Sequence, residues 1–191
     1  MKIATLPLLL SLLFLTSCGL QSIPQANNQV AADWAEVMNQ YKRRTDLIPN
    51  LVATVKGYAS HEKETLEGVI NARAKATSVN VDAKNLTPET MQKFQDAQGG
   101  LSQALGRLMV VAEKYPDLKA NEQFIGLQSQ LEGTENRIAI ARRRYIEAVQ
   151  GFNNLVTVFP TSLTNSLVHH FDKKPQFTVS ETETQTPKVE F

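Results

Sequence analysis

The sequence predicts an all-α protein folded as an antiparallel four-helix bundle. Apolar residues recur at spacings of three and four along most of the chain, which is the period of one helix face. No stretch alternates convincingly between apolar and polar residues, so half-buried strands are not expected. Proline and capping residues divide the apolar pattern into segments, which indicates where successive helices begin and end.

The first residues predict a lipoprotein signal peptide. Lys2 provides a short positive region, and residues 3–15 form an apolar core of the length expected in a signal. As a helix this core spans only ~20 Å, against ~30 Å of hydrocarbon in a bilayer, which is short for a transmembrane helix. The following Leu15-Thr16-Ser17-Cys18 resembles the bacterial lipobox.

Cys18 is the one cysteine in the chain, which excludes an internal disulfide and a cysteine-based metal site. Its thiolate is the expected acceptor of diacylglycerol, after which residues 1–17 are removed. Several acyl chains on Cys18 hold a protein stably at a membrane, where a single chain holds it marginally. Residues 18–28 are short, polar and contain a proline, and are predicted to form the lipidated cysteine and a flexible tether.

The charge balance argues against nucleic acid as a partner. Lys2 belongs to the signal, so of the 20 basic and 19 acidic residues of the chain, 19 of each remain in the mature protein. A neutral chain has no net field that steers it towards a polyanion.

The first two helices are predicted on either side of Pro49. Apolar residues at Trp34, Val37 and Tyr41 mark one face of the first. Pro49 has no N–H to donate to the carbonyl of Thr45, so the helix kinks there or a new one begins near residue 46. The second helix runs to about residue 76, and its expected inner residues are Val52, Val55, Leu66 and Ile70.

The third helix begins at Thr87-Pro88-Glu89, where Thr87 can cap, Pro88 suits the first helical position and Glu89 suits the positive end of the dipole. Its predicted inner stripe is Met91, Phe94, Gln98, Leu101, Leu105, Leu108, Ala112 and Tyr115. Glycines at 99, 100 and 106 are costly in a helix interior. They are interpreted as positions where a neighbouring helix comes close.

The fourth helix is the most regular, with Asn121 as its expected cap. Its seam repeats at spacings of three and four over five heptads, at Phe124, Leu127, Leu131, Thr134, Ile138, Ala141, Tyr145, Ala148, Phe152, Leu155 and Phe159. Phe159-Pro160 ends it, and residues 161–171 are expected to add one short helix. The bundle domain is thus predicted over residues 29–171, followed by a polar, mostly disordered tail at 172–191.

An alternative has three long helices, with the first kinked at Pro49 and running on to residue 76. The third helix is ~42 Å long and would then pack on a first helix of ~75 Å. Much of the apolar face of that first helix would stay in water. The four-helix arrangement buries that face better and is preferred.

Several segments together resemble the LemA family. Residues 40–52 (QYKRRTDLIPNLV) are similar to its most characteristic segment, and VKGYA and HE continue it at residues 55–59 and 61–62. YPDLKA at 115–120 and GTENRIA at 133–139 match further hallmarks, as do Phe152-Asn153 and Phe159-Pro160 at the end of the fourth helix. The resemblance covers roughly residues 30–177. It implies a helical-bundle domain outside the cytoplasm of a bacterium, in a family without an established biochemical activity, and many of its members are held by a transmembrane helix where this chain has a lipobox.

The sequence offers no constellation typical of an enzyme. His61-Glu62 lacks the second histidine of a zincin, because Thr65 stands four residues after the first. No histidine follows a glutamate at the spacing of the ferritin-like sites, and the adjacent His169 and His170 point apart on a helix. No nucleophile elbow or phosphate-binding glycine loop is present. We therefore expect no catalytic residues, metal or cofactor.

Two polar sets remain, one just before Pro49 and one midway along the fourth helix. Their members are Arg43, Arg44, Asp46, Glu135, Asn136, Arg137 and Arg142. The favoured interpretation is structural, with interhelical ion pairs and groups that satisfy the carbonyl freed by Pro49. The other interpretation is a docking surface for a protein partner.

These features favour a membrane-tethered interaction or scaffold lipoprotein of the cell envelope, with protein partners of unknown identity. The alternative is an envelope enzyme or a small-ligand carrier with a site inside the bundle. Because Gly19 follows Cys18, and not the Asp that commonly retains lipoproteins at the inner membrane, a host with two membranes is expected to place the protein on the periplasmic face of the outer one.

Overall fold

The computed structural model describes residues 19–83 and 86–177, and within them it contains helices and loops and no strand. The predicted all-α class is confirmed. The signal peptide and Cys18 lie outside the described residues. The elements are α2 (Ser22–Tyr58), α3 (Lys63–Ser78), α4 (Pro88–Ala112), α5 (Pro116–Lys119), α6 (Glu122–Thr157), α7 (Thr161–Thr164) and the π-helical turn η2 (Asn165–His169).

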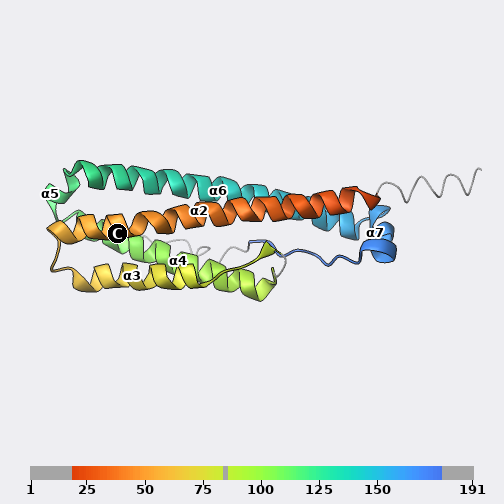
Figure 1. Cartoon of the computed structure of the whole chain (residues 1–191), viewed down its shortest axis with the longest axis horizontal. Coiled ribbons are helices and arrows are strands. Elements are labelled where there is room, and N and C mark those ends of the chain that lie inside the picture. Colours follow the sequence, from red (N-terminus) through yellow and green to blue (C-terminus); the bar gives the residue numbers. More distant parts are fainter. Residues whose placement is uncertain (1–18, 84–85, 178–191) are drawn as a thin grey trace, which may run out of the picture.

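Two long helices run the length of the molecule, and two shorter helices cover one half of them. α2 and α6 lie antiparallel over their whole length, while α3 and α4 pack on the half near α5 (Figure 1). α7 and η2 lie at the opposite end, beside the start of α2. Four antiparallel helices therefore pack together along one half of the molecule, and two along the other.

The predicted break at Pro49 is wrong. α2 continues through Pro49 to Tyr58, and the chain first turns at residues 59–62, where the Glu62 N–H donates to the Ala59 carbonyl at 3.1 Å. The proline is tolerated because α3 supplies the missing donor. Arg73 Nε donates to the Thr45 carbonyl at 2.9 Å. The three-helix alternative also fails, because α2 ends well before residue 76.

The later break changes which residues of α3 face inward. Leu66 is buried as predicted, but Ile70 is 51% exposed and Val69 is buried in its place. The prediction assumed one unbroken helix from residue 46, and the turn at 59–62 resets the helical register before Leu66. A periodicity counted across a turn assigns the wrong face.

The predicted tether is mostly helix. α2 begins at Ser22, and Ile23 is fully buried together with Val30, one heptad later. These residues pack on the end of α6, in the cluster that contains Phe152 and Val156. The folded domain thus begins near residue 22, and a flexible link over residues 22–28 is excluded.

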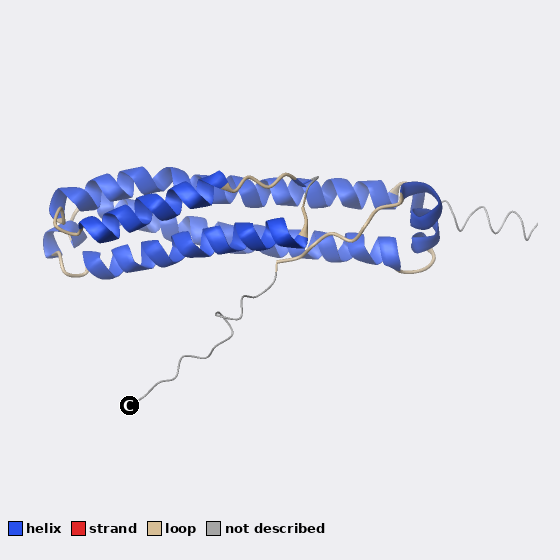
Figure 2. Ribbon diagram, turned by 90° about the horizontal axis from the view of Figure 1, so that it is seen from below, coloured by secondary structure: helices blue, strands red, loops and turns tan. Residues whose placement is uncertain are grey.

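Residues 172–177, assigned to the polar tail, also pack on the bundle. After η2 the chain runs back along α2 and α6 in extended form (Figure 2). Phe177 is buried, the Tyr145 hydroxyl donates to the Pro175 carbonyl at 2.9 Å, and Asn153 Nδ2 donates to the Lys174 carbonyl at 3.0 Å. This segment covers the half of α2 and α6 that α3 and α4 leave open. The rest of the predicted tail, residues 178–191, lies outside the described residues.

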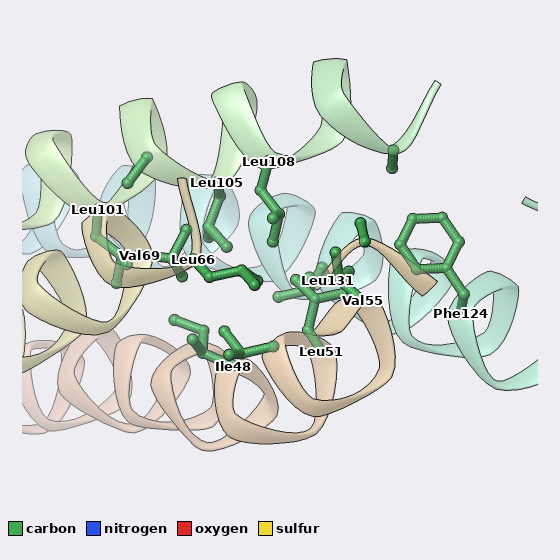
Figure 3. Packing of buried hydrophobic residues seen from close by; sticks show 14 of the residues in the cluster. Ile48, Leu51, Val55, Leu66, Val69, Leu101, Leu105, Leu108, Phe124 and Leu131 are labelled. Carbon is green, nitrogen blue, oxygen red and sulfur yellow. The ribbon is translucent and has the colours of Figure 1, made fainter. Parts of the chain in front are cut away.

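The core is divided in the same way. One cluster of aliphatic residues lies where α2, α3, α4 and α6 meet, and its labelled members Ile48, Val69, Leu101 and Leu131 converge from four helices (Figure 3). The second cluster lies towards the other end and combines aliphatic residues with most of the buried aromatic rings. It holds Trp34, Tyr41, Phe94, Tyr145, Phe152 and Phe177. The junction of the two clusters is where the polar residues gather.

Candidate functional site

Arg44 is the centre of a buried polar network at this junction. Its side chain is 1% exposed although it carries a charge. Nη1 donates to Glu135 Oε1 at 2.8 Å and to Ser102 Oγ at 2.9 Å, and Nη2 donates to Gln98 Oε1 at 2.6 Å and to the Gln98 carbonyl at 3.2 Å. The guanidinium carbon lies 5.1 Å from the centre of the Tyr41 ring.

The network joins all four helices of the half-bundle. Gln98 Nε2 extends it to the Ala76 carbonyl of α3 at 3.3 Å. Arg44 on α2, Gln98 on α4 and Glu135 on α6 supply the rest. A buried arginine is strongly destabilising unless its donors are bonded and its charge is paired. Here both terminal nitrogens are used, while Nε has no hydrogen-bond partner among the described residues. Arg44 is therefore occupied by the fold and is not free to meet a ligand.

Of the remaining members of the polar sets, Arg142 lies beside Tyr41 at the network, where it opposes the rise in the Tyr41 pKa that burial causes, and the others are at the surface. Arg43, Asn136 and Arg137 are exposed, and no hydrogen bond or ion pair joins them to another side chain in the described part of the chain. The Arg142 guanidinium lies 4.6 Å from the centre of the Phe177 ring. Asp46 is exposed at the edge of a cavity. Of the seven residues, Arg44, Glu135 and Arg142 thus gather around Tyr41, with one ion pair between Arg44 and Glu135, and the other four lie apart from them at the surface.

The cavity lies beside Gln98, between α2, α4 and the chain leaving α3, and has a volume of about 300 Å³. Its lining residues include Met38, Tyr41, Lys42, Thr45, Asp46, Thr77, Asn80, Phe94 and Gln98. Its inner wall is largely apolar and aromatic, and burial raises the pKa of Tyr41, so that its phenol stays neutral. One lysine and one aspartate are the charges at its edge. Its volume is at the lower end of the range of small-molecule sites.

A second concave surface runs outside the bundle, between α3 and α4, with a volume of about 340 Å³. We call it the α3–α4 groove. Its lining residues are Gly68, Asn71, Ala72, Lys75, Asp96, Ala97, Gly100, Gln103, Ala104 and Arg107. The floor is made of glycine and alanine, and the rim carries charges of both signs.

The glycines of α4 are not in close contact with a neighbouring helix, contrary to the prediction. A Cβ atom added at Gly99, Gly100 or Gly106 meets no described atom within 4 Å, and the same is true of Gly68 across the groove. The space over these residues is open. In the described residues no group of three metal-binding side chains occurs, and no helix is long and apolar enough to span a bilayer.

No role was assigned from the sequence to Gln98 or Arg73, two side chains whose hydrogen bonds join the helices at this junction. Gln98 carried a signal, because it was the one polar residue in an apolar stripe. Arg73 carried none, because its partner is a backbone carbonyl 28 residues away on another helix.

Comparison with known proteins identifies the relatives of the chain. The model of the LemA family matches residues 33–191. "Protein LemA" of Metamycoplasma hominis is 25% identical over 142 residues, which are 71% of this chain and 61% of that protein. The magnetosome protein MamQ 1 of Paramagnetospirillum magneticum is 38% identical over 64 residues, 34% of this chain and 24% of its own. MamQ of Magnetospirillum gryphiswaldense is 29% identical over 98 residues, 49% of this chain and 35% of its own. The matches thus span less than two thirds of each of these relatives.

Proposed function

The chain belongs to the LemA family, and we propose that it is a membrane-tethered, non-enzymatic lipoprotein of the bacterial cell envelope that docks other proteins in its α3–α4 groove. The names of the relatives give no reaction; those of MamQ refer to the magnetosome. The proposal therefore depends on the lipobox at Cys18 for the tether and on the groove for the interaction.

The observation that carries the docking function is the open glycine floor of the groove. Gly68 and Gly100 are exposed on helices, and a side chain at either position would meet nothing. Each glycine in a helix interior costs ~1 kcal/mol relative to alanine, so these residues weaken the isolated fold and add no packing to it. A backbone or helix from another protein that approaches closely uses the space that they leave.

The rim indicates the chemistry of the partner. Lys75 and Arg107 are basic, Asp96 is acidic, and Asn71 and Gln103 are neutral donors and acceptors. A partner helix with small or apolar residues on one face and charges of both signs beside it complements this surface. Charges at a rim set orientation and specificity more than affinity.

The test compares Gly100→Leu with Gly106→Leu. Both replace an exposed glycine of α4 with a better helix former, so both should fold with unchanged or raised thermal stability. Only Gly100 lines the groove. With a photo-crosslinking residue at Gln103 of the lipidated full chain in intact cells, we expect a discrete crosslinked partner in the wild type and Gly106→Leu, and none in Gly100→Leu. An identical crosslinking pattern in the two variants would refute docking in this groove.

A small-ligand carrier is the second candidate, favoured by the cavity beside Gln98. Thr77→Trp places a large ring at the edge of that cavity and away from the groove. If the protein carries a small molecule, native mass spectrometry of the wild type should show a bound mass that Thr77→Trp lacks and Gly100→Leu retains. Absence of any bound mass from the wild type leaves the docking function as the one supported.

A further inference from the structure

The end of the molecule that bears α7 carries an exposed apolar surface, which we call the anchor-end patch. It consists of Leu20, Val158, Phe159, Leu163, Leu167 and Val168. Six of the eleven large hydrophobic residues exposed in the described residues are thus gathered at one end, and Phe159 is 72% exposed. Single exposed apolar side chains are ordinary, but such a concentration marks an interaction surface.

The two long helices have no Asp, Glu, Lys or Arg for several turns at this end, although Lys174 of the returning segment lies beside α6, with Nζ 5.8 Å from the centre of the Phe152 ring. The first charged residue of the described chain is Asp33, so residues 19–32 have none, and residues 148–171 have none between Glu147 and Asp172. Neutral Asn, Gln, Ser and Thr take their place. Along α2 and α6 this uncharged collar extends ~15 Å from the end of the bundle at 1.5 Å per residue. The headgroup zone on each side of a bilayer is ~5–8 Å thick, so the collar is deep enough to enter it.

The chain that leads to the membrane is fixed to this patch. Gly19 is buried against Thr164 of α7 so closely that a Cβ at residue 19 would lie 2.7 Å from Thr164 Cβ. Thr164 is itself buried. One peptide bond separates Gly19 from Cys18, and the apolar residues 3–15 precede it. Whatever holds residues 1–18 at a bilayer therefore holds the anchor-end patch there too.

We propose that the anchor-end patch inserts into the interfacial zone of the lipid bilayer, so that the protein has a second, monotopic contact with the membrane besides its anchor. Apolar insertion drives this contact, because the collar on α2 and α6 has no Lys or Arg to attract anionic lipid. This membrane contact depends on the tether of the proposed function and does not depend on the docking groove. Since α2 and α6 both extend from the patch side by side, the contact also orients the two long helices away from the bilayer plane.

The test places single labels on the lipidated full chain in vesicles of phosphatidylcholine alone. Cys18 is the natural chain's one cysteine and its thiol is consumed by lipid in the proposed function, so a new cysteine can be labelled selectively. Fluorophores at Phe159→Cys and Leu167→Cys should be quenched by a quencher attached to the lipid chains and protected from iodide. Ser60→Cys, in the turn at the far end, and Ile140→Cys, midway on α6, should show the reverse. Added salt should not change either result.

Each other outcome has a separate meaning. Equal iodide quenching at residues 159 and 60 would overturn the proposal. Protection of residue 159 from both quenchers, with energy transfer between differently labelled copies, would assign the patch to self-association and would also overturn it. Loss of crosslinking at Gln103 with unchanged quenching at residue 159 would refute the docking groove alone. Failure of lipid attachment would appear as a protein that does not float with the vesicles.

Discussion

Pro49 and Arg73 show how a single side chain preserves a long helix. The proline removes the donor that the Thr45 carbonyl needs, and Arg73 of the neighbouring helix provides another at 2.9 Å. A buried carbonyl that loses its partner costs about as much as the hydrogen bond that satisfied it. This contact links α3 to α2 in addition to the aliphatic residues that the two helices bury against each other.

We expect Arg73→Ala to lower the free energy of unfolding by ~1–3 kcal/mol. In a Pro49→Ala background the backbone N–H of residue 49 becomes available to Thr45, so the same change at Arg73 should cost ~1 kcal/mol less. Denaturant unfolding of the four proteins in this double-mutant cycle measures the difference. Lys75→Ala, on the exposed side of α3, is the control and should show no coupling to Pro49. Additive effects of Pro49 and Arg73 would contradict the contact.

Arg44 and Arg43 are neighbours in sequence with opposite environments. Removal of Glu135 leaves the buried Arg44 guanidinium without its counter-charge, while the Glu135 side chain itself is 48% exposed, which reduces the expected loss. We expect Glu135→Ala to cost ~1–3 kcal/mol in the wild type and close to nothing after Arg44→Met. Arg43→Ala, on the surface, should change stability by less than ~0.5 kcal/mol. Equal losses from Arg43→Ala and Glu135→Ala would mean that α2 is rotated from the described register.

At the level of elements, the sequence predicted helix caps and seams better than helix ends. The Thr90 N–H donates to Thr87 Oγ1 at 3.2 Å and the Phe124 N–H donates to Asn121 Oδ1 at 3.0 Å, as the capping patterns predicted. Local hydrogen bonds of this kind are encoded within four residues. The continuation of α2 through Pro49 was missed because it depends on Arg73, which the fold brings from another helix.

The seam of α6 shows a second limit. Residues Thr134, Ile138, Ala141, Tyr145 and Phe152 are buried as predicted, but the heptad continuation then gives way to Val149 and Val156, and Phe159 is exposed beyond the helix end. A helix of 3.6 residues per turn drifts by ~20° per heptad, so a strict heptad leaves the buried face after several repeats. The candidate site was predictable only in part. Arg44 and Glu135 were both named from the sequence, but which residues form an ion pair depends on how the helices pack.

Residues 172–177 were predicted from composition to belong to a disordered tail, but they pack on the bundle. The fluorescence of Trp34 can measure that packing. The Trp34 and Phe177 rings lie 6.0 Å apart, and Trp34 is the one tryptophan of the chain. We expect Phe177→Ala to cost up to ~3 kcal/mol in unfolding free energy, because a buried aromatic ring leaves a cavity. Trp34 fluorescence should shift to longer wavelength as water reaches the indole. The exposed Phe159→Ala is the control, and should leave both the emission and the stability unchanged. Unaltered Trp34 emission in Phe177→Ala would show that residues 172–177 are not bound to the bundle in solution.

For the whole molecule, the prediction that decides the anchor concerns Cys18. In the proposed function the Cys18 thiol accepts the diacylglycerol, so we expect Cys18→Ser to abolish lipid labelling and to leave the precursor uncleaved, since the peptidase acts after acylation. Gel mobility and radiolabelled fatty acid incorporation measure both effects. Normal processing of Cys18→Ser would exclude a lipoprotein. In a host with two membranes, density-gradient fractionation should place the wild type with outer-membrane markers, and recovery with inner-membrane markers would contradict that sorting.

If the chain is anchored at Cys18 and docks partners in the α3–α4 groove, as we propose, the start of α2 at Ser22 determines how far that groove is from the lipid. Glu135, level with Arg44 at the inner edge of the four-helix half, precedes the end of α6 by 22 residues, which is ~33 Å at 1.5 Å per residue. A long flexible leader would allow the domain to sample every altitude above the bilayer and to meet partners at any of them. A helix that begins beside the proposed anchor would hold the groove at a fixed height, and the search for partners would then be confined to a layer parallel to the membrane. Selection of a partner then depends on whether its helix is presented at that altitude as well as on the complementarity of its surface.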